Sequence, residues 1–258
     1  MNLMKEGNAP LVAIGFLGKG LQLLTHPKLR GFVIFPVLIN IVLYSIAFFV
    51  SYHYVNQLII QSVPDWLQWL SWILIPLFFI SFFVISFFTF TVLANLMASP
   101  FYGVLAARTL SLIDNEAQVV ELPMMQVILG ELKRVIYILA RMLPLLFLSV
   151  IPIINIIAPV IWAVFGAWML AMEFMAYPLE NSGLLFVEQR ELLKTVRMGA
   201  LSFGGVTMLG LSLPIINIMI GPAAVIGATL YFHEMSEKTE KIEKTSLEKQ
   251  TDSAINDE

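Results

Sequence analysis

Two cationic side chains, Lys28 and Arg30, follow a proline and precede a long apolar stretch. Pro27 suits the first turn of a helix, and Thr25 or His26 precedes it where a capping residue lies. Lys28 and Arg30 would then lie beside free backbone N–H groups at a helix N-terminus, a combination that binds tetrahedral oxyanions. The alternative is an ordinary positive cluster that keeps this end of the chain on the cytoplasmic side.

Two apolar stretches are interrupted midway by similar five-residue sequences, IPIIN at Ile151–Asn155 and LPIIN at Leu213–Asn217. A proline removes a helix hydrogen bond, so these sequences predict discontinuous helices, which in a bilayer line a path or a binding site. Asn155 and Asn217 each follow the break, where asparagine caps the resumed helix well. Two such N-termini near mid-membrane would favour an anion, or each asparagine satisfies only its own turn.

Arg141 opens the third apolar stretch, and Lys133 and Arg134 precede it by one to two helical turns. Basic residues at this place can form a cytoplasmic vestibule for anions. The alternative is that they reach lipid phosphates, or that Glu131 and Glu173 neutralise them. The candidate anion pathway consists of Asn155, Asn217, Arg134 and Arg141.

Catalytic and cofactor chemistry finds no support in the sequence. The three histidines, His26, His53 and His233, are scattered without metal-ligand spacing, and there is no cysteine. We find no zinc-protease, hydrolase, P-loop or dinucleotide motif. A formal charge of −3 argues against nucleic acid. We therefore expect neither an enzyme nor a metal or cofactor site.

The elements that position these residues are predicted by four stretches without charged residues. The chain is 59% hydrophobic and 13% charged, whereas soluble domains carry about 25% charged residues. Each stretch exceeds the roughly 20 apolar residues that span a bilayer. The composition predicts a polytopic helical membrane protein. The stretches are Gly31–Pro64, Trp66–Ala107, Met142–Met172 and Met198–Phe232.

Lysine and arginine positions predict the topology. The segment His53–Asp65 has no lysine or arginine. These residues occur in the segment before the first stretch, in the segment between the second and third stretches, in Glu173–Arg197 and in the C-terminal tail. If the last two stretches are re-entrant hairpins, every positive segment lies in the cytoplasm and only His53–Asp65 is outside. Each arm of the third stretch, about 15 residues, is also shorter than the hydrocarbon core. The alternative is that Pro152 and Pro214 only kink two straight spans.

The predicted fold is an all-α integral membrane protein with two long transmembrane helices, two re-entrant hairpins and amphipathic surface helices. One membrane domain covers 1–233, and 234–258 is a charged, partly disordered cytoplasmic tail that starts as a short helix. The run Pro10–Leu24 predicts a surface helix. The second stretch predicts a continuous helix toward Asn95, with Trp66, Trp69 and Trp72 as interfacial anchors.

Several short sequence motifs, in a fixed order along the chain, carry a family resemblance. The segment Pro27–Asn40 reads PKLRGFVIFPVLIN, and Val63–Ser71 reads VPDWLQWLS. In these motifs the chain resembles the bacterial sulfate transporter CysZ family up to about His233. The other matching segments are Ala94–Ala106, Ala158–Trp162, Ala167–Ala171, Tyr177–Asn181 and Gly227–Thr229.

The resemblance implies ATP-independent uptake of sulfate across the bacterial inner membrane for cysteine biosynthesis. It implies a homo-oligomer with two full spans and partly inserted hairpins. It places the sulfate site at the arginine-containing motif before the first span. The corresponding residues here are Arg30, Lys28, Leu29 and Gly31.

The chain departs from the family pattern at four positions. The pattern has glycine where Lys28 stands and a second arginine where Gly31 stands. It can also have acidic residues near Ala107 and at Ala176, so the resemblance does not extend to an ion-pair gate there.

Two classes of function stay open from the sequence. One is a channel or proton-coupled transporter for sulfate or a related oxyanion such as sulfite, thiosulfate, selenate or molybdate. The other is a non-transporting membrane scaffold or assembly factor. Oligomer size and single or dual insertion also stay open.

Overall fold

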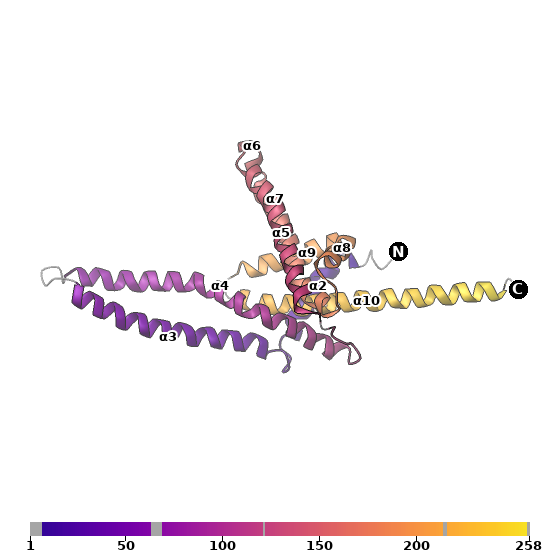
Figure 1. Ribbon diagram of the computed structural model, residues 1–258, viewed down its shortest axis with the longest axis horizontal. Helices are drawn as coiled ribbons and strands as arrows, with labels where there is room; N and C mark the ends of the chain where they lie inside the picture. The colour runs from indigo at the N-terminus through magenta and orange to yellow at the C-terminus, as the bar shows by residue number, and fades with distance from the viewer. Residues whose placement is uncertain (1–6, 63–68, 121, 214–215, 257–258) are drawn as a thin grey trace. The chain divides into compact units, whose positions relative to one another are not determined.

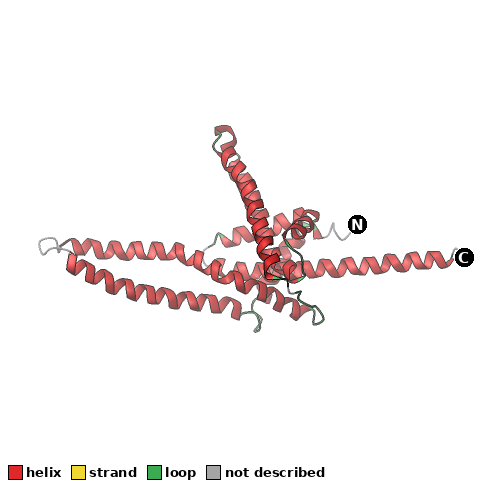
Figure 2. Cartoon of the chain, in the orientation of Figure 1, coloured by secondary structure: helices red, strands yellow, loops and turns green. Residues whose placement is uncertain are grey.

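The computed structural model describes residues 7–62, 69–120, 122–213 and 216–256, and every regular element among them is helical (Figure 2). Segments of α3, α7 and α10 are long and apolar enough to cross a membrane. The predicted all-α membrane class is therefore confirmed. The helices are α2 (Pro10–Leu23), α3 (Gly31–Ser62), α4 (Ser71–Ile113), α5 (Met124–Ser149), α6 (Pro152–Asn155), α7 (Ala158–Asn181), α8 (Phe186–Thr195), α9 (Arg197–Leu211) and α10 (Asn217–Asn256) (Figure 1).

The segment Gly31–Phe101 forms one compact unit, in which α3 and the first part of α4 lie antiparallel (Figure 1). Phenylalanine rings join them, because the Phe48 ring lies 5.6 Å from that of Phe82 and 5.8 Å from that of Phe79. Among the residues of the apolar window in α3 whose burial the structure describes, none is buried within the chain. Such a helix matches lipid rather than water. The continuous helix predicted through Asn95 is confirmed by α4.

Exposed tryptophans precede or open α4. Trp69 and Trp72 are both largely exposed, as interfacial anchors are, and Trp66 lies outside the described residues. Their role as anchors stays a prediction, since it depends on the position of the membrane surface.

The second unit, Met1–Arg30 with Tyr102–Glu258, contains both predicted hairpins. The first consists of α5 and α7, with the short α6 at the tip (Figure 1). The chain reverses there, because the backbone N–H of Val120, before α5, donates to the carbonyl of Asn181, the last residue of α7, at 2.8 Å. The two ends of this hairpin therefore lie on the same side.

The second hairpin consists of α9 and α10. Gly199 near the start of α9 lies against the Tyr231 side chain, and Gly210 near its end lies against Ile220. The two helices are thus antiparallel, although Pro214 lies outside the described residues. The arrangement as hairpins is confirmed, and the alternative of two kinked straight spans is wrong. In the first hairpin, α5 and α7 have 26 and 24 residues and are longer than the predicted arms of about 15 residues, so partial insertion stays a prediction.

Small residues let these helices approach closely at two crossings. A Cβ on Gly20 of α2 would overlap the carbonyl oxygen of Ala223 in α10, and one on Gly227 would lie 2.7 Å from the carbonyl oxygen of Phe16. A Cβ on Gly204 of α9 would overlap the carbonyl oxygen of Ala167 in α7. Close backbone packing of this kind is typical of membrane helices.

We predict that Gly204→Ala destabilises the protein strongly whereas Gly205→Ala does not. The added methyl group at 204 meets a backbone oxygen that cannot move aside, while at 205 it finds the Ala167 Cβ at an ordinary 3.8 Å. Overpacking costs about 1–3 kcal/mol. Thermal unfolding in detergent compares the two neighbours directly, and equal melting temperatures would contradict the close crossing of α7 and α9.

The N-terminal helix α2 and the C-terminal tail differ in part from the sequence predictions. One face of the predicted surface helix α2 is buried, with Ala13, Phe16 and Leu17 inside, while Leu11 stays exposed. The tail continues α10 as far as Asn256, a longer helix than the short one that its charged composition predicts.

Candidate anion-binding site

His26 organises the turn that presents Lys28 and Arg30. The His26 carbonyl accepts from the backbone N–H groups of Leu29 at 2.9 Å and Arg30 at 3.0 Å. Its ring Nδ1 lies 3.3 Å from the backbone nitrogen of Lys28, in the position of a side-chain cap. The predicted capping by His26 before Pro27 is therefore present. The turn extends through Arg30, and α3 itself begins at Gly31, later than Pro27 suggests.

This turn separates one buried side chain from two exposed charges. Leu29 is fully buried and anchors the turn, whereas Lys28 and Arg30 are exposed. The backbone N–H groups of all three residues already have acceptors in His26. The two cationic side chains are thus the groups that this conformation offers to an anion, in place of the free backbone N–H groups expected from sequence. Gly31 adds open space, since a Cβ there would meet nothing within 4 Å.

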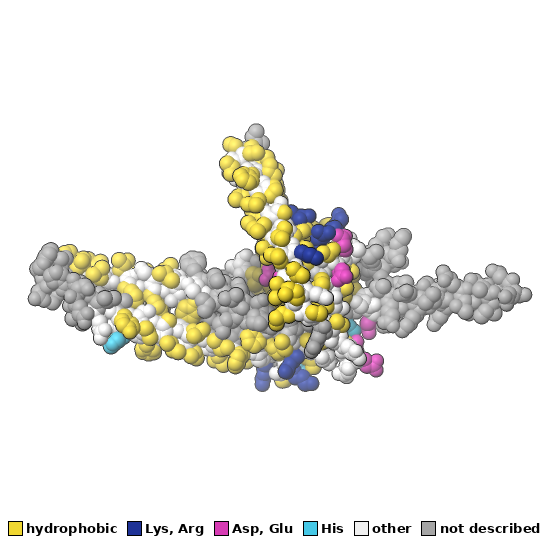
Figure 3. Space-filling view, viewed as in Figure 1, with side chains coloured by type: hydrophobic (Ala, Val, Ile, Leu, Met, Phe, Trp, Pro, Cys, Tyr) yellow, Lys and Arg dark blue, Asp and Glu magenta, His cyan; other side chains and the backbone are white. Residues whose placement is uncertain are grey.

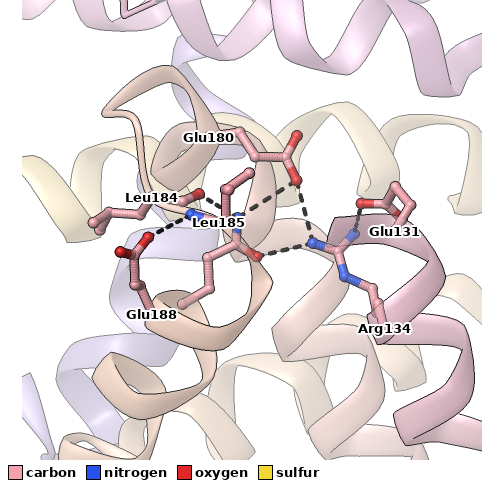
Figure 4. A network of polar contacts seen from close by, with 7 residues as sticks. Glu131, Arg134, Glu180, Leu184, Leu185 and Glu188 are labelled. Carbon is pink, nitrogen blue, oxygen red and sulfur yellow. Dashed lines mark hydrogen bonds and ion pairs between the residues drawn. The ribbon is translucent and has the colours of Figure 1, made fainter. Parts of the chain in front are cut away.

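Arg134 on α5 is held by acidic and amide side chains from three helices (Figure 4). Its Nη1 lies 2.7 Å from Glu131 Oε1, and its Nη2 lies 3.2 Å from Glu180 Oε1. The same Nη2 donates to Gln189 Oε1 at 2.9 Å. Gln189 Nε2 in turn donates to the carbonyl of Leu184 at 2.8 Å. The network therefore joins α5, the end of α7 and the start of α8.

The loop between α7 and α8 brings these groups together. Gly183 has φ 82°, a left-handed conformation that favours glycine and ends α7. The Glu188 carboxylate accepts from the Leu185 N–H at 2.8 Å and caps α8. Arg134 is thereby neutralised by Glu131, as predicted, and by Glu180, which is the second carboxylate at ion-pair distance. The predicted partner Glu173 also interacts electrostatically with Arg134. The place of Arg134 in an anion pathway stays a prediction.

Arg141 lies one helical turn further along α5 than Tyr137. Its guanidinium carbon is 3.6 Å from the centroid of the Tyr137 ring, and its Nη1 donates to the Tyr137 carbonyl at 3.5 Å. Arg190 of α8 lies 5.6 Å from the same ring. Trp168 Nε1 donates to the Tyr137 hydroxyl at 3.2 Å, so α7 also holds this ring.

The Glu191 carboxylate on α8 forms ion pairs with two cations of the same helix. Glu191 Oε1 lies 2.7 Å from Lys194 Nζ and 2.8 Å from Arg190 Nη2. Hydrogen bonds from Lys194 and then Arg190 lower the pKa of the Glu191 carboxyl. Figure 3 shows Lys and Arg side chains gathered beside the foot of the α5–α7 hairpin, with hydrophobic side chains over the part of the hairpin above them.

The structure corrects the predicted role of Asn155 as a cap. Asn155 is the exposed last residue of α6, and the cap position of α7 is Ile157, which makes no side-chain capping hydrogen bond. Asn217 is the first residue of α10, and Ile216 before it accepts from the N–H groups of Met219 and Ile220. A role of either asparagine in an anion path stays a prediction.

Sequence reasoning missed three polar residues that join distant parts of the chain. Asn8 Oδ1 accepts from the backbone N–H groups of Met198 at 2.7 Å and Gly199 at 3.3 Å, which caps α9 from the other end of the chain. Glu180 and Gln189 were missed because their partner Arg134 is 46 and 55 positions away. Within the described residues, no three His, Cys, Asp or Glu side chains could together hold a metal ion.

The comparisons with known proteins agree with one another. The family model described as sulfate transporter CysZ/etoposide-induced protein 2.4 matches residues 16–222. A Pseudomonas aeruginosa (strain LESB58) protein named sulfate transporter CysZ is 38% identical over 235 residues, which cover 86% of this chain and 95% of that protein. A Salmonella typhimurium protein of the same name is 36% identical over 230 residues, covering 85% and 91%.

Proposed function

Because the chain belongs to the family of the sulfate transporter CysZ and etoposide-induced protein 2.4, we propose that it takes up sulfate across the bacterial inner membrane. The observation that carries this proposal is the match over nearly the full length of proteins named sulfate transporter CysZ. The protein is multi-pass, needs no ATP, cofactor or catalytic residue, and supplies sulfate for cysteine biosynthesis. It works as a homo-oligomer in the lipid bilayer.

Sulfate binds at the turn of Lys28 and Arg30 in this proposal. Two exposed cations on a turn held by His26 and anchored by Leu29 can hold a dianion without closing around it. Arginine supplies paired N–H donors to two oxygens, whereas lysine adds a point charge. Binding on an exposed turn that does not enclose the anion also permits release, which transport requires.

In this proposal, the anion crosses the membrane along a path lined by the starts of α7 and α10. Both lie at hairpin tips, where interrupted backbone inside a bilayer is tolerated if it lines a path. Their positive helix ends, rather than capping by Asn155 or Asn217, would favour the anion. Arg134 enters this path only if its carboxylate partners release it.

Sulfate flux into liposomes that contain only the purified protein tests the function. We expect uptake of labelled sulfate above that of empty liposomes. Uptake that depends on an imposed proton gradient would indicate coupling, and uptake without one a channel. A monodisperse protein that gives no flux under either condition would favour the scaffold or assembly factor instead.

We predict that a cysteine at position 182 is labelled only from the cytoplasm and one at position 53 only from the periplasm. Ser182 is exposed just after α7, and the segment around His53 has no lysine or arginine. The background is clean because the chain has no cysteine. Periplasmic labelling at 182 alone would contradict the topology, and labelling from both sides at both positions would indicate dual insertion.

A further inference from the structure

The basic side chains around Tyr137 form a group that sulfate binding at Lys28 and Arg30 does not use. Lys133, Tyr137 and Arg141 are spaced by four residues along α5, so they share one helix face. Arg190 reaches the same ring from α8. Because both guanidinium groups lie on one ring, their carbon atoms are separated by no more than the sum of 3.6 and 5.6 Å. One phosphate group can contact two cations at such a separation.

The charge of this group is only partly neutralised. Within the described part of the chain, no carboxylate lies at ion-pair distance from Lys133 or Arg141. Glu191 takes one nitrogen of Arg190 and is shared with Lys194. Glu131, the nearest other carboxylate on α5, is paired with Arg134. The group therefore keeps a net positive charge, and Lys133 and Arg141 are both exposed.

The surroundings of the group indicate lipid rather than a dissolved anion. Beyond Arg141, toward the hairpin tip, the exposed side chains of α5 and α7 are apolar. A long alkyl stem that crosses apolar surface to place its charge at the polar boundary is the usual behaviour of arginine in a membrane interface. The exposed residues of this apolar surface include Leu143, Leu146, Phe147, Val150, Val160 and Val164.

The direction of the Arg141 side chain agrees with this placement. Its guanidinium group contacts the ring and carbonyl of Tyr137, one turn closer to the start of α5, as side chains on a helix tilt toward its N-terminus. Arg141 precedes the last residue of α5, Ser149, by eight positions, or about 12 Å. The Arg141 side chain also reaches back by one helical turn, which adds about 5 Å. The end of α5 at the hairpin tip would therefore lie roughly 17 Å deeper in the membrane than a phosphate bound by Arg141. That is about half of the roughly 30 Å hydrocarbon core.

We propose that Lys133, Tyr137, Arg141 and Arg190 bind the phosphate of an anionic phospholipid and so set the depth of the α5–α7 hairpin. The charge complementarity, the apolar surface beyond the group and the direction of Arg141 together favour a lipid headgroup over free phosphate. This site is separate from the sulfate turn and does not depend on sulfate transport.

Native mass spectrometry of delipidated protein tests the site with phosphatidylglycerol and phosphatidylcholine of equal acyl chains. Wild-type protein should retain the anionic lipid preferentially. Arg141→Gln should reduce that preference on the order of tenfold, the effect of one charge-assisted hydrogen bond. Since Arg141 is exposed, this variant should fold, and Arg141→Gln/Arg190→Gln should remove the preference. The control Lys28→Gln/Arg30→Gln should retain it.

Three outcomes would overturn the proposal. Equal retention of both lipids, unchanged in Arg141→Gln, would mean that the group binds no particular headgroup. Displacement of phosphatidylglycerol by inorganic phosphate, but not by sodium chloride of equal ionic strength, would make it a site for free anions. Loss of sulfate flux by Arg141→Gln in vesicles made only of phosphatidylcholine would also contradict the proposal. These vesicles hold no anionic lipid, so the loss would assign Arg141 to the anion path.

Discussion

Arg30→Ala is expected to weaken sulfate binding by about ten- to a hundred-fold, with Lys28→Ala having a smaller effect. The loss of a charge-assisted hydrogen bond costs on the order of 1.5–3 kcal/mol. The turn itself should survive, because its hydrogen bonds use the backbone of Arg30 and its anchor is the buried Leu29. Isothermal titration of the purified variants with sulfate measures both effects.

Arg30→Lys separates the two contributions of the arginine. It keeps the charge but loses the planar fork of donors, so we expect an affinity between those of wild type and Arg30→Ala. Arg190→Ala is a useful second control, since it removes a cation far along the chain while leaving the turn intact. If Arg30→Ala bound sulfate as tightly as wild type, the cluster would serve topology alone, as the positive-inside alternative holds.

The hairpins could be predicted from sequence because local signals define them. Each of the last two apolar stretches contains a proline near its middle, and the segments on both sides of each stretch carry lysine or arginine. A proline lacks the N–H of a helix interior but is well placed in a first turn. The structure uses Pro152 in the first turn of α6 and Pro159 in the first turn of α7. Pro159 was the available signal that α7 starts at Ala158, three residues after Asn155, which places Asn155 outside the cap position.

The contacts between hairpins could not be predicted in the same way. Arg134 meets Glu180 only because α5 and α7 fold back with a particular register, and Gln189 only because Gly183 turns the chain toward α8. A one-residue change in either register would rotate these side chains by about 100° around their helices. No local pattern carries that information. The turn at His26 is the opposite case, since its cap, proline and cations are consecutive residues.

Arg134→Met is expected to destabilise the protein by about 3 kcal/mol, because it leaves Glu180 without its cation. The Arg134 side chain is only 13% exposed and that of Glu180 26%, so water replaces the lost partner poorly. Thermal unfolding in detergent should show a fall in Tm on the order of 10 °C. The matched control is Lys194→Met, which breaks an ion pair whose side chains are 37% and 55% exposed and should lower Tm much less than Arg134→Met does.

The double variant Arg134→Met/Glu180→Gln decides the cause of any loss. If the cost comes from an uncompensated carboxylate, removal of that charge should restore most of the stability, because the neutral amide that replaces the carboxylate can still pair with Gln189. If the double variant is as unstable as Arg134→Met, the loss comes instead from the packing of the arginine stem and from its bonds to Glu131 and Gln189. Equal stability of Arg134→Met and Lys194→Met would mean that the network does not hold the α5–α7 hairpin to α8. The hairpin would then have to be positioned by its crossing with α9 and by lipid.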